Sequence, residues 1–453
     1  MRILSTLVVC LLAFSAAAAE DPTYAALRAA RPDGRTIALH DFTFNRDVYS
    51  LKLNGTLHLL APVDKQTFGA VFIGQGSYEL TPVLPYELRQ LQIQTGDDKL
   101  ATLTDTFDTA VFFAADLISA AENSGGDIGT GAPNARAKEV FDDYLKRQRR
   151  DFKTNVHIRL AQERMNARLE PLFFAALDGK KYPPAILGVD PLGMNALLLS
   201  GFNAGGEQTV FFVNDLEKGG IWYSSPLRRQ LQSGQIVQAG ALADAEHYEI
   251  ETTINSNLEV AGKTTVHFIA GNELRVLPLS LMGKLAVSEA VFTDAENVSW
   301  APVAVIQEKA EEDSNLAVVF PAKLKRGGKY LLRISYRGKD VLNDAGDGNF
   351  TVGARTSWYP NIGAFDDLAT YDLTYRNPQK FQVISVGNEA ESSVDGDWKV
   401  AHWKAANPIR VAGFNYGKFR KMANADTDSG MTIEVHTNPG EPDIIKTINK
   451  NME

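Results

Sequence analysis

The side chains best suited to acid–base, nucleophilic or metal chemistry do not form a known motif in this sequence. No two of its seven histidines lie four residues apart, so the His-Glu-x-x-His motif of helical zinc sites is absent. The Gly-x-Ser-x-Gly motif of serine nucleophiles is also absent. Cys10 is the single cysteine, which excludes a disulfide within the chain and a cluster of thiolate ligands. We therefore expect no catalytic residue, no metal ligand and no cofactor within this chain, and we assign none to its histidines, which are His40, His58, His157, His247, His267, His402 and His436.

Two loops contain residue types that bind phosphate or calcium in other proteins. The segment Ser124–Pro133 is rich in glycine, but no Lys-Ser/Thr pair follows it and no clear strand–helix–strand unit surrounds it. We interpret it as a linker. Asp340, Asp344, Asp347 and Asn349 depart from the spacing of a calcium loop, and no glutamate closes the pattern. An ordinary Asp/Gly turn accounts for this loop.

The composition is that of a globular protein of several domains. The chain has 453 residues, of which 44% are hydrophobic and 22% charged, and this length suggests roughly two to four domains. Its formal net charge of -9 has the wrong sign for a protein that neutralises a phosphate backbone. We therefore expect no nucleic-acid partner. Basic residues between Lys146 and Lys153 are interpreted as the solvated face of a helix.

The N-terminus has the order of a secretory signal peptide. Arg2 precedes an apolar run from Ile3 to about Phe14, and small residues ending at Ala19 follow it. The apolar run is shorter than the ~20 residues that a spanning helix needs. Residues 1–19 are therefore predicted to be removed, which leaves Glu20 first and no membrane span. The mature protein is expected to be exported, to the periplasm or the extracellular space.

The rest of the chain divides into two regions with different patterns. Residues 20–240 are predicted to form a β-rich accessory region with one long amphipathic helix at about 134–170. Apolar and polar residues alternate more cleanly from Tyr248 onward, which is typical of strands buried on one face. Residues 245–425 are therefore expected to form a large twisted antiparallel β-sheet domain. The fold class is mainly β.

One stretch of the second region resembles a known enzyme family. Arg355–Asn361 reads RTSWYPN, a strand-like run up to Pro378 follows it, and Val383–Gly387 reads VISVG. This order resembles the N-terminal β domain of zinc aminopeptidases of the aminopeptidase N type, where an R-x-W-[FY]-P segment precedes such a strand and a V-x-S-x-G turn. The resemblance covers residues 245–425, because further segments occur in the family's order at Tyr248–Asn257, Leu274–Leu279, Lys284–Val287, Pro321–Tyr336 and Val411–Phe414.

The resemblance implies that this domain packs against a thermolysin-like zinc domain and shapes one wall of a substrate cleft. The candidate residues for a cleft wall or a domain-packing corner are Arg355, Trp358, Tyr359 and Pro360, and we expect Trp358 to lie in the core. The family's zinc ligands and its Gly-x-Met-Glu-Asn motif belong to the next domain and do not occur here. Zinc and the peptide substrate are therefore expected in a domain beyond this chain. Residues 348–354 also lack the Gln or Glu that family members often place before the corner to hold a free amine.

The last residues are expected to begin that catalytic domain. Met431–Thr437 alternates like a strand, and Ile444, Ile448 and Met452 fall on one face of a helix. We interpret 431–453 as the start of a truncated domain whose reading frame continues into a His-Glu-x-x-His motif. The protein would then be the exported N-terminal part of a zinc metallopeptidase. The alternative is a non-catalytic secreted β-sandwich protein that binds or scaffolds, and the coding sequence beyond this chain discriminates between the two.

Overall fold

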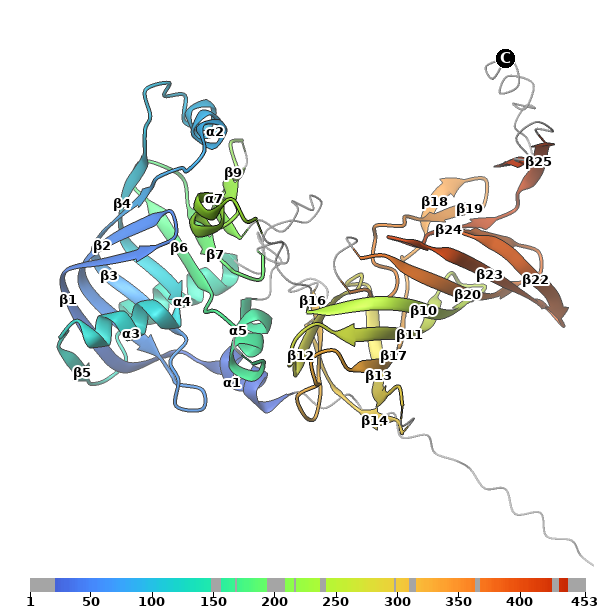
Figure 1. Ribbon diagram of the computed structural model, residues 1–453, viewed down its shortest axis with the longest axis horizontal. Coiled ribbons are helices and arrows are strands. Elements are labelled where there is room, and N and C mark those ends of the chain that lie inside the picture. Colours follow the sequence, from blue (N-terminus) through green and yellow to red (C-terminus); the bar gives the residue numbers. More distant parts are fainter. Residues whose placement is uncertain are drawn as a thin grey trace, which may run out of the picture.

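The computed structural model of the chain has two β-rich regions that lie side by side along its long axis (Figure 1). No helix in the described part of the chain is long and apolar enough to cross a membrane. The predicted signal peptide lies outside the described residues, which are 21–147, 156–167, 169–193, 208–215, 217–236, 242–296, 299–308, 315–362, 367–425 and 432–438.

The first region is built on one sheet of nine strands, in which every neighbouring pair is antiparallel. In sheet order the strands are β5 (Ile128–Thr130), β1 (Pro32–Arg46), β2 (Tyr49–Leu60), β3 (Gly69–Leu80), β4 (Leu103–Phe113), β6 (Phe173–Gly179), β7 (Ala185–Val189), β8 (Thr209–Val213) and β9 (Gly220–Ser225). β5 lies inside the segment that we predicted to be a linker, so that prediction is wrong for Ile128–Thr130. The segment pairs with β1 because its glycines separate short stretches that can still adopt an extended backbone.

Helices contribute to a hydrophobic core on each face of this sheet. α2 (Pro85–Thr95) and α3 (Ala115–Asn123) contribute Leu91 and Leu117 to one core, in which β2 and β8 also meet. α1 (Pro22–Ala29), α4 (Ala135–Arg147) and α5 (Val156–Met165) contribute to the other. α7 (Arg228–Ser233) follows the last strand. The sequence predicted only one long helix here, and α1, α2, α3 and α7 were not anticipated.

The predicted long helix corresponds to two helices in the described part of the chain. Asn134 caps α4, because its side-chain oxygen accepts hydrogen bonds from the backbone amides of Arg136 and Ala137. α5 ends at Met165, and residues 148–155 between the two helices lie outside the described residues. Tyr144 on α4 and Val156 on α5 are both buried.

The antiparallel strands β2 and β3 face each other at a pair of glycines that no other residue type would fit. Gly55 lies directly opposite Gly74. A Cβ atom on Gly55 would lie 2.7 Å from the Cα atom of Gly74, and one on Gly74 would lie 2.6 Å from the Cα atom of Gly55. Such distances are shorter than van der Waals contact. The two strands can therefore approach this closely only because both side chains are absent.

The second region stacks sheets on one another. Its largest sheet has eight strands, and smaller sheets of three and four strands share a hydrophobic core with it. The eight strands, in sheet order, are β14 (Ala301–Pro302), β13 (Leu285–Asp294), β17 (Lys329–Gly338), β11 (Val260–Ala270), β10 (Ala243–Ile254), β20 (Ala369–Pro378), β23 (Trp398–Ile409) and β22 (Asn388–Asp395). The smaller sheets contain β12 (Val276–Ser280), β16 (Asn315–Val319) and β15 (Ala304–Gln307), then β18 (Asn343–Gly346), β19 (Asn349–Val352), β24 (Phe414–Gly417) and β21 (Gln382–Ser385), and finally β25 (Arg420–Ala425) with β26 (Thr432–Thr437).

The mainly-β prediction is confirmed, with one difference in strand direction. Along β10, the side chains of Tyr248, Ile250, Thr252 and Ile254 are buried and alternate with more exposed ones, as the pattern predicted. β10 and β20 are parallel, whereas the other pairs of the eight-stranded sheet are antiparallel. The long segment between β10 and β20 forms other strands, and this allows the chain to return in the same direction.

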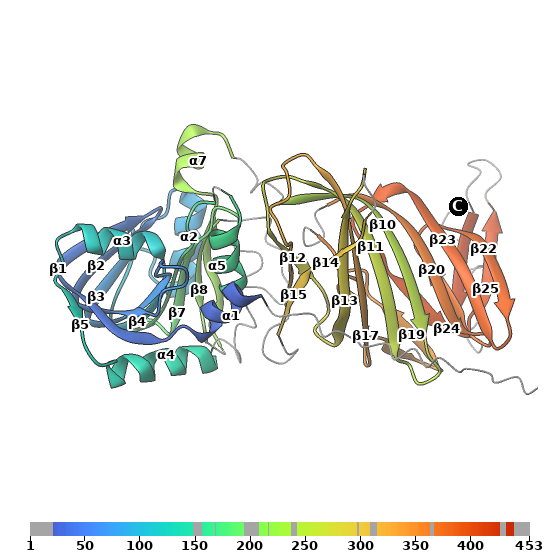
Figure 2. The same cartoon turned by 90° about the horizontal axis from the view of Figure 1, so that it is seen from below.

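The two regions share one core through the three-stranded sheet. Leu277 and Leu316 point into the core of the second region, whereas Ala317 and Val319 point into the core that α1, α4 and α5 cover. This sheet is therefore buried on both faces. Figures 1 and 2 both place α1 and α5 between the first region and this sheet.

Polar contacts reinforce this junction. Asn166, just after α5, accepts hydrogen bonds from the backbone amides of Arg275 and Val276 at 2.7 and 2.8 Å. Its amide nitrogen donates to the carbonyl of Val276 at 3.1 Å. Asn166 thus pairs with the edge of β12 as a further strand would. On α1, the hydroxyl of Tyr24 donates to Glu308 at 2.6 Å.

Candidate functional site

The aromatic corner predicted from the sequence lies in the core of the second region. Trp358 and Tyr359 are fully buried, Pro360 is buried, and Arg355 is exposed. The indole Nε1 of Trp358 donates to the carbonyl of Ala412 at 2.8 Å. The structure therefore brings three of the four predicted residues together and leaves Arg355 in solvent. A cleft wall formed with another domain stays a prediction.

The corner joins separate sheets. Asn361 and Ser280 exchange backbone hydrogen bonds of 2.9 and 3.0 Å, which connects the corner to the end of β12. Ser357 adopts a left-handed backbone (φ 51°), and its carbonyl accepts from the amide of Met282 at 2.8 Å. A serine rarely adopts this conformation without such support. The corner is thus a structural junction between the three-stranded and four-stranded sheets.

Buried tyrosines around the corner cannot act as bases. The rings of Tyr248 and Tyr371 stack with centroids 5.2 Å apart, and the hydroxyls of Tyr359 and Tyr371 are 3.1 Å apart. Burial raises the pKa of all three phenols above the ordinary value. They therefore stay protonated at neutral pH and contribute packing and hydrogen bonds rather than proton transfer.

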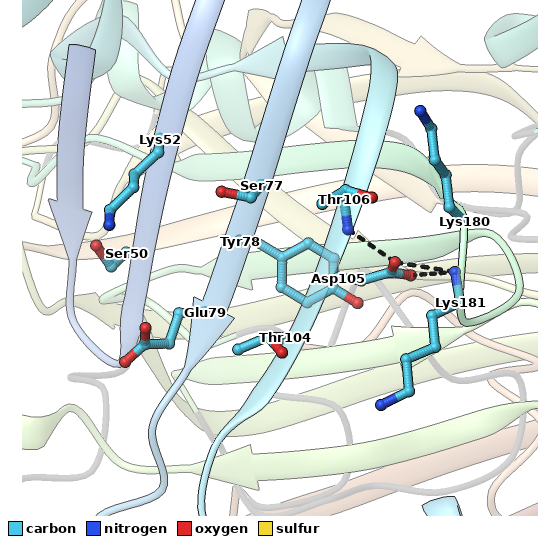
Figure 3. A pocket seen from close by; sticks show the side chains of 10 residues that line it. All are labelled: Ser50, Lys52, Ser77, Tyr78, Glu79, Thr104, Asp105, Thr106, Lys180 and Lys181. Carbon is cyan, nitrogen blue, oxygen red and sulfur yellow. Dashed lines mark hydrogen bonds between the residues drawn. The ribbon is translucent and has the colours of Figure 1, made fainter. Parts of the chain in front are cut away.

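A polar hollow on the first region is the second candidate. It has a volume of about 410 Å³ and lies over β2, β3, β4 and the turn after β6 (Figure 3). Strand register sets two rows of side chains on one face, because Lys52 lies opposite Ser77 and Ser77 opposite Thr106. The second row, one pair further along, consists of Ser50, Glu79 and Thr104.

Asp105 holds the turn that completes the hollow. Its carboxylate accepts hydrogen bonds from the backbone amides of Lys181 and Tyr182, each at 2.9 Å. This positions Lys180 and Lys181 across the strands from Lys52, as Figure 3 shows. Lys180 forms an ion pair with Asp108 at 2.7 Å. The hollow thus offers hydroxyl and ammonium donors to a polar or anionic group.

The hollow is suited to binding rather than to catalysis. Its lining contains no histidine or cysteine. Burial raises the pKa of Tyr78 far above its ordinary value, so its phenol remains protonated. Sequence reasoning missed this group because Lys52 on β2 and the lysines of the turn after β6 lie more than a hundred residues apart in the sequence. The alternation of Ser50 and Lys52 with buried leucines was the only local signal.

A cluster of buried, paired charges lies on α5 of the first region. Arg159 donates from Nε to both carboxylate oxygens of Asp190, at 3.0 and 2.8 Å, and lies 3.7 Å from Glu163. Burial raises the pKa of Glu163, although a backbone bond from Leu172 and the charge of Arg159 oppose this. These contacts fix α5 to β7 and the following turn. The charges of this cluster are paired with one another, so we interpret it as structural.

Among the described residues, no three His, Cys, Asp or Glu side chains are gathered as a complete set of metal ligands. His247, His267 and His402 lie on the outer face of the eight-stranded sheet, each beside a carboxylate. His157, on α5, is buried against Phe113. The expected strand at Met431–Thr437 is present as β26, which pairs with β25. The helix expected at its end lies outside the described residues.

Comparison with solved structures finds M1 zinc metallopeptidases. A variant of the enzyme from Deinococcus radiodurans bound to Tyr-Ser-Ala is 19% identical with a TM-score of 0.38, over 46% of this chain and 50% of that chain. The M1 zinc metallopeptidase from the same organism is 18% identical with a TM-score of 0.35, over 44% and 48%. The match thus spans about half the length of each of those chains. No family model matches the sequence, and neither does any curated protein.

Proposed function

We propose that this chain is the exported N-terminal part of a zinc metallopeptidase with aminopeptidase-like activity. The supporting observation is the bond between the Trp358 indole and Ala412, because it joins two segments of the family resemblance that lie far apart in the sequence. Phe414 also contacts Trp358, with centroids 5.0 Å apart. The hydroxyl of Tyr375 lies 2.8 Å from that of Ser385 in a third segment. Segments quoted for one resemblance thus meet in one core.

In this proposal the second region supports a catalytic domain outside the chain. That domain would hold the zinc ion, whose bound water attacks the peptide carbonyl with a glutamate as general base. The described residues of this chain supply no ligand set for it. Their part is to present the aromatic corner and the sheets around it as a rigid wall. The peptide substrate is proposed to bind between that wall and the catalytic domain.

The test begins with the reading frame. We expect it to continue beyond Glu453 and to encode His-Glu-x-x-His followed by a downstream glutamate. The complete protein should hydrolyse aminoacyl amides and lose this activity with a chelator, whereas this chain alone should be inactive. A stop codon directly after Glu453, with no frameshift nearby, would overturn the proposal and favour the secreted binding protein.

Export is tested by intact mass. The proposal expects a periplasmic or extracellular product that begins at Glu20. A mature product that retains Cys10 would contradict export with signal cleavage.

The polar hollow favours the second candidate, a non-catalytic binding protein. Its donors suit an anionic or hydroxyl-rich group, although its lining presents no exposed aromatic ring. If binding is the function, replacing Lys52 and Lys181 by glutamate should abolish retention of the protein by an anionic matrix. Retention unchanged by both substitutions would remove this candidate.

A further inference from the structure

We propose that His247 and His267 form a surface site for a divalent transition-metal ion that prefers imidazole ligands, such as Zn²⁺ or Cu²⁺. The two residues lie directly opposite each other on β10 and β11. Their side chains are 24% and 33% exposed, so an ion can reach them from solvent. This site is separate from the zinc of the proposed catalytic domain and does not depend on the proposed function.

The spacing of the two rings fits a shared ion. Their centroids are 5.3 Å apart, and the ring planes are nearly perpendicular at 84°. With a metal–nitrogen distance of about 2.1 Å and tetrahedral geometry, two imidazoles on one ion have centroids about 5 Å apart. The backbone register therefore places both rings at the required separation.

Both Nε2 atoms face carboxylates on the same side. Nε2 of His267 donates a hydrogen bond to Oε1 of Glu249 at 3.0 Å, which a bound ion would replace. Nε2 of His247 is 3.6 Å from Oδ2 of Asp372. Glu249 and Asp372 are themselves opposite each other on β10 and β20. Asp372 also pairs with Lys404 at 3.3 Å, which makes Glu249 the better third ligand.

Nδ1 of His247 is hydrogen-bonded to a neighbouring oxygen, as the second ring nitrogen of metal-binding histidines usually is. The hydroxyl of Thr370 donates to the carbonyl of Glu246 at 3.3 Å, which leaves its oxygen to accept from Nδ1–H of His247 at 2.7 Å. In this arrangement Nε2 carries no proton and can bind a metal. Burial lowers the pKa of His247, which favours the same neutral form.

Two imidazoles alone make an exchangeable site rather than a structural one. Among the described residues, no third side chain lies in position to bind the ion. Water or a rotated Glu249 side chain would therefore complete the coordination.

The experiment is a metal titration of the full chain purified without a polyhistidine tag. Zn²⁺ binding is measured by calorimetry, and Cu²⁺ coordination by electron paramagnetic resonance. The parent should bind one ion and show coupling to two imidazole nitrogens. His247→Asn, whose amide can replace Nδ1–H towards Thr370, and His267→Ala should each weaken binding by about tenfold or more and leave one coupled nitrogen.

His402→Ala is the matched control. His402 lies on the same face, 3.0 Å from the hydroxyl of Thr374 and 3.8 Å from Glu391, and its loss should leave affinity and spectrum unchanged. Metal-free thermal melts verify that each variant is folded; if His267→Ala is not, His267→Gln replaces it. Equal affinity in the parent and the double variant, or an equal loss in His402→Ala, would overturn the proposal.

Discussion

The two regions bury their sheets in different ways. In the first, apolar neighbours such as Val71 and Phe72 are both buried, because a hydrophobic core lies on each face of the nine-stranded sheet. In the second, Tyr248 is buried while Glu249 points to solvent, because the eight-stranded sheet packs on one face only. The first region therefore leaves little strand surface for ligands beyond its polar hollow, whereas the second presents a whole face of charged residues and histidines.

The largest effect should come from Trp358→Ala, which attacks the sheet-on-sheet core. Deleting this fully buried ring removes its packing and the hydrogen bond to Ala412, and should cost about 3 to 5 kcal/mol of unfolding free energy. Calorimetric melts measure this loss. Trp398→Ala is the control, since Trp398 is partly exposed and packs on Arg376 at the surface. A Trp358→Ala variant that melts like the parent, while a joined catalytic domain loses activity, would instead place Trp358 in the cleft.

A smaller effect is expected at the junction between the regions. Asn166→Ala leaves the amides of Arg275 and Val276 without their partner, which should cost about 2 to 3 kcal/mol. Because the junction couples the regions, the melt should also broaden or divide into two transitions. Scanning calorimetry at several scan rates measures both changes. A single sharp transition at the parent's midpoint would show that the apolar part of the junction suffices.

The smallest effect is the pH dependence of the buried charges in the first region. The folded pKa of Glu163 lies above its unfolded value, so the folded state binds the proton more tightly. Stability of the parent should therefore fall as the pH rises from the ordinary glutamate pKa through the raised one, and this penalty is absent below that window. Glu163→Gln lacks the titration. Denaturant unfolding from about pH 4 to 8 measures the free energy of unfolding of both proteins. The free energy of the variant should rise relative to that of the parent across that window, and a constant difference between the two would contradict the assignment.

How well the sequence predicts a strand depends on whether its sheet is buried on one face or on both. Alternation is visible along β10 because one face is exposed, and it correctly indicated strands. Runs such as Val111–Phe113 are buried on both sides, so their periodicity is lost. The short helices α2 and α3 were missed because each has no more than about three turns, whose apolar residues resemble strand fragments.

The candidate sites were predictable only in part. The corner was found because its residues are contiguous and their types are unusual together. The pairing of His247 with His267 depends on the register of β10 and β11, which includes a bulge between Ala245 and His247. Register is set by turns and by tertiary packing rather than by local composition. The position of Lys181 and Lys52 in the lining of one hollow likewise depends on the pairing of all the strands between them.

The three-stranded sheet shared by both regions sets an order of assembly. During synthesis the first region emerges before β12, β15 and β16, so the apolar face of α1 and α5 has no cover until about residue 319 has appeared. We expect a recombinant fragment that ends near residue 240 to aggregate. A fragment that begins near residue 240 should expose Val276 and Val319. A chaperone that shields this face would therefore matter most during the interval in which only the first region has been synthesised.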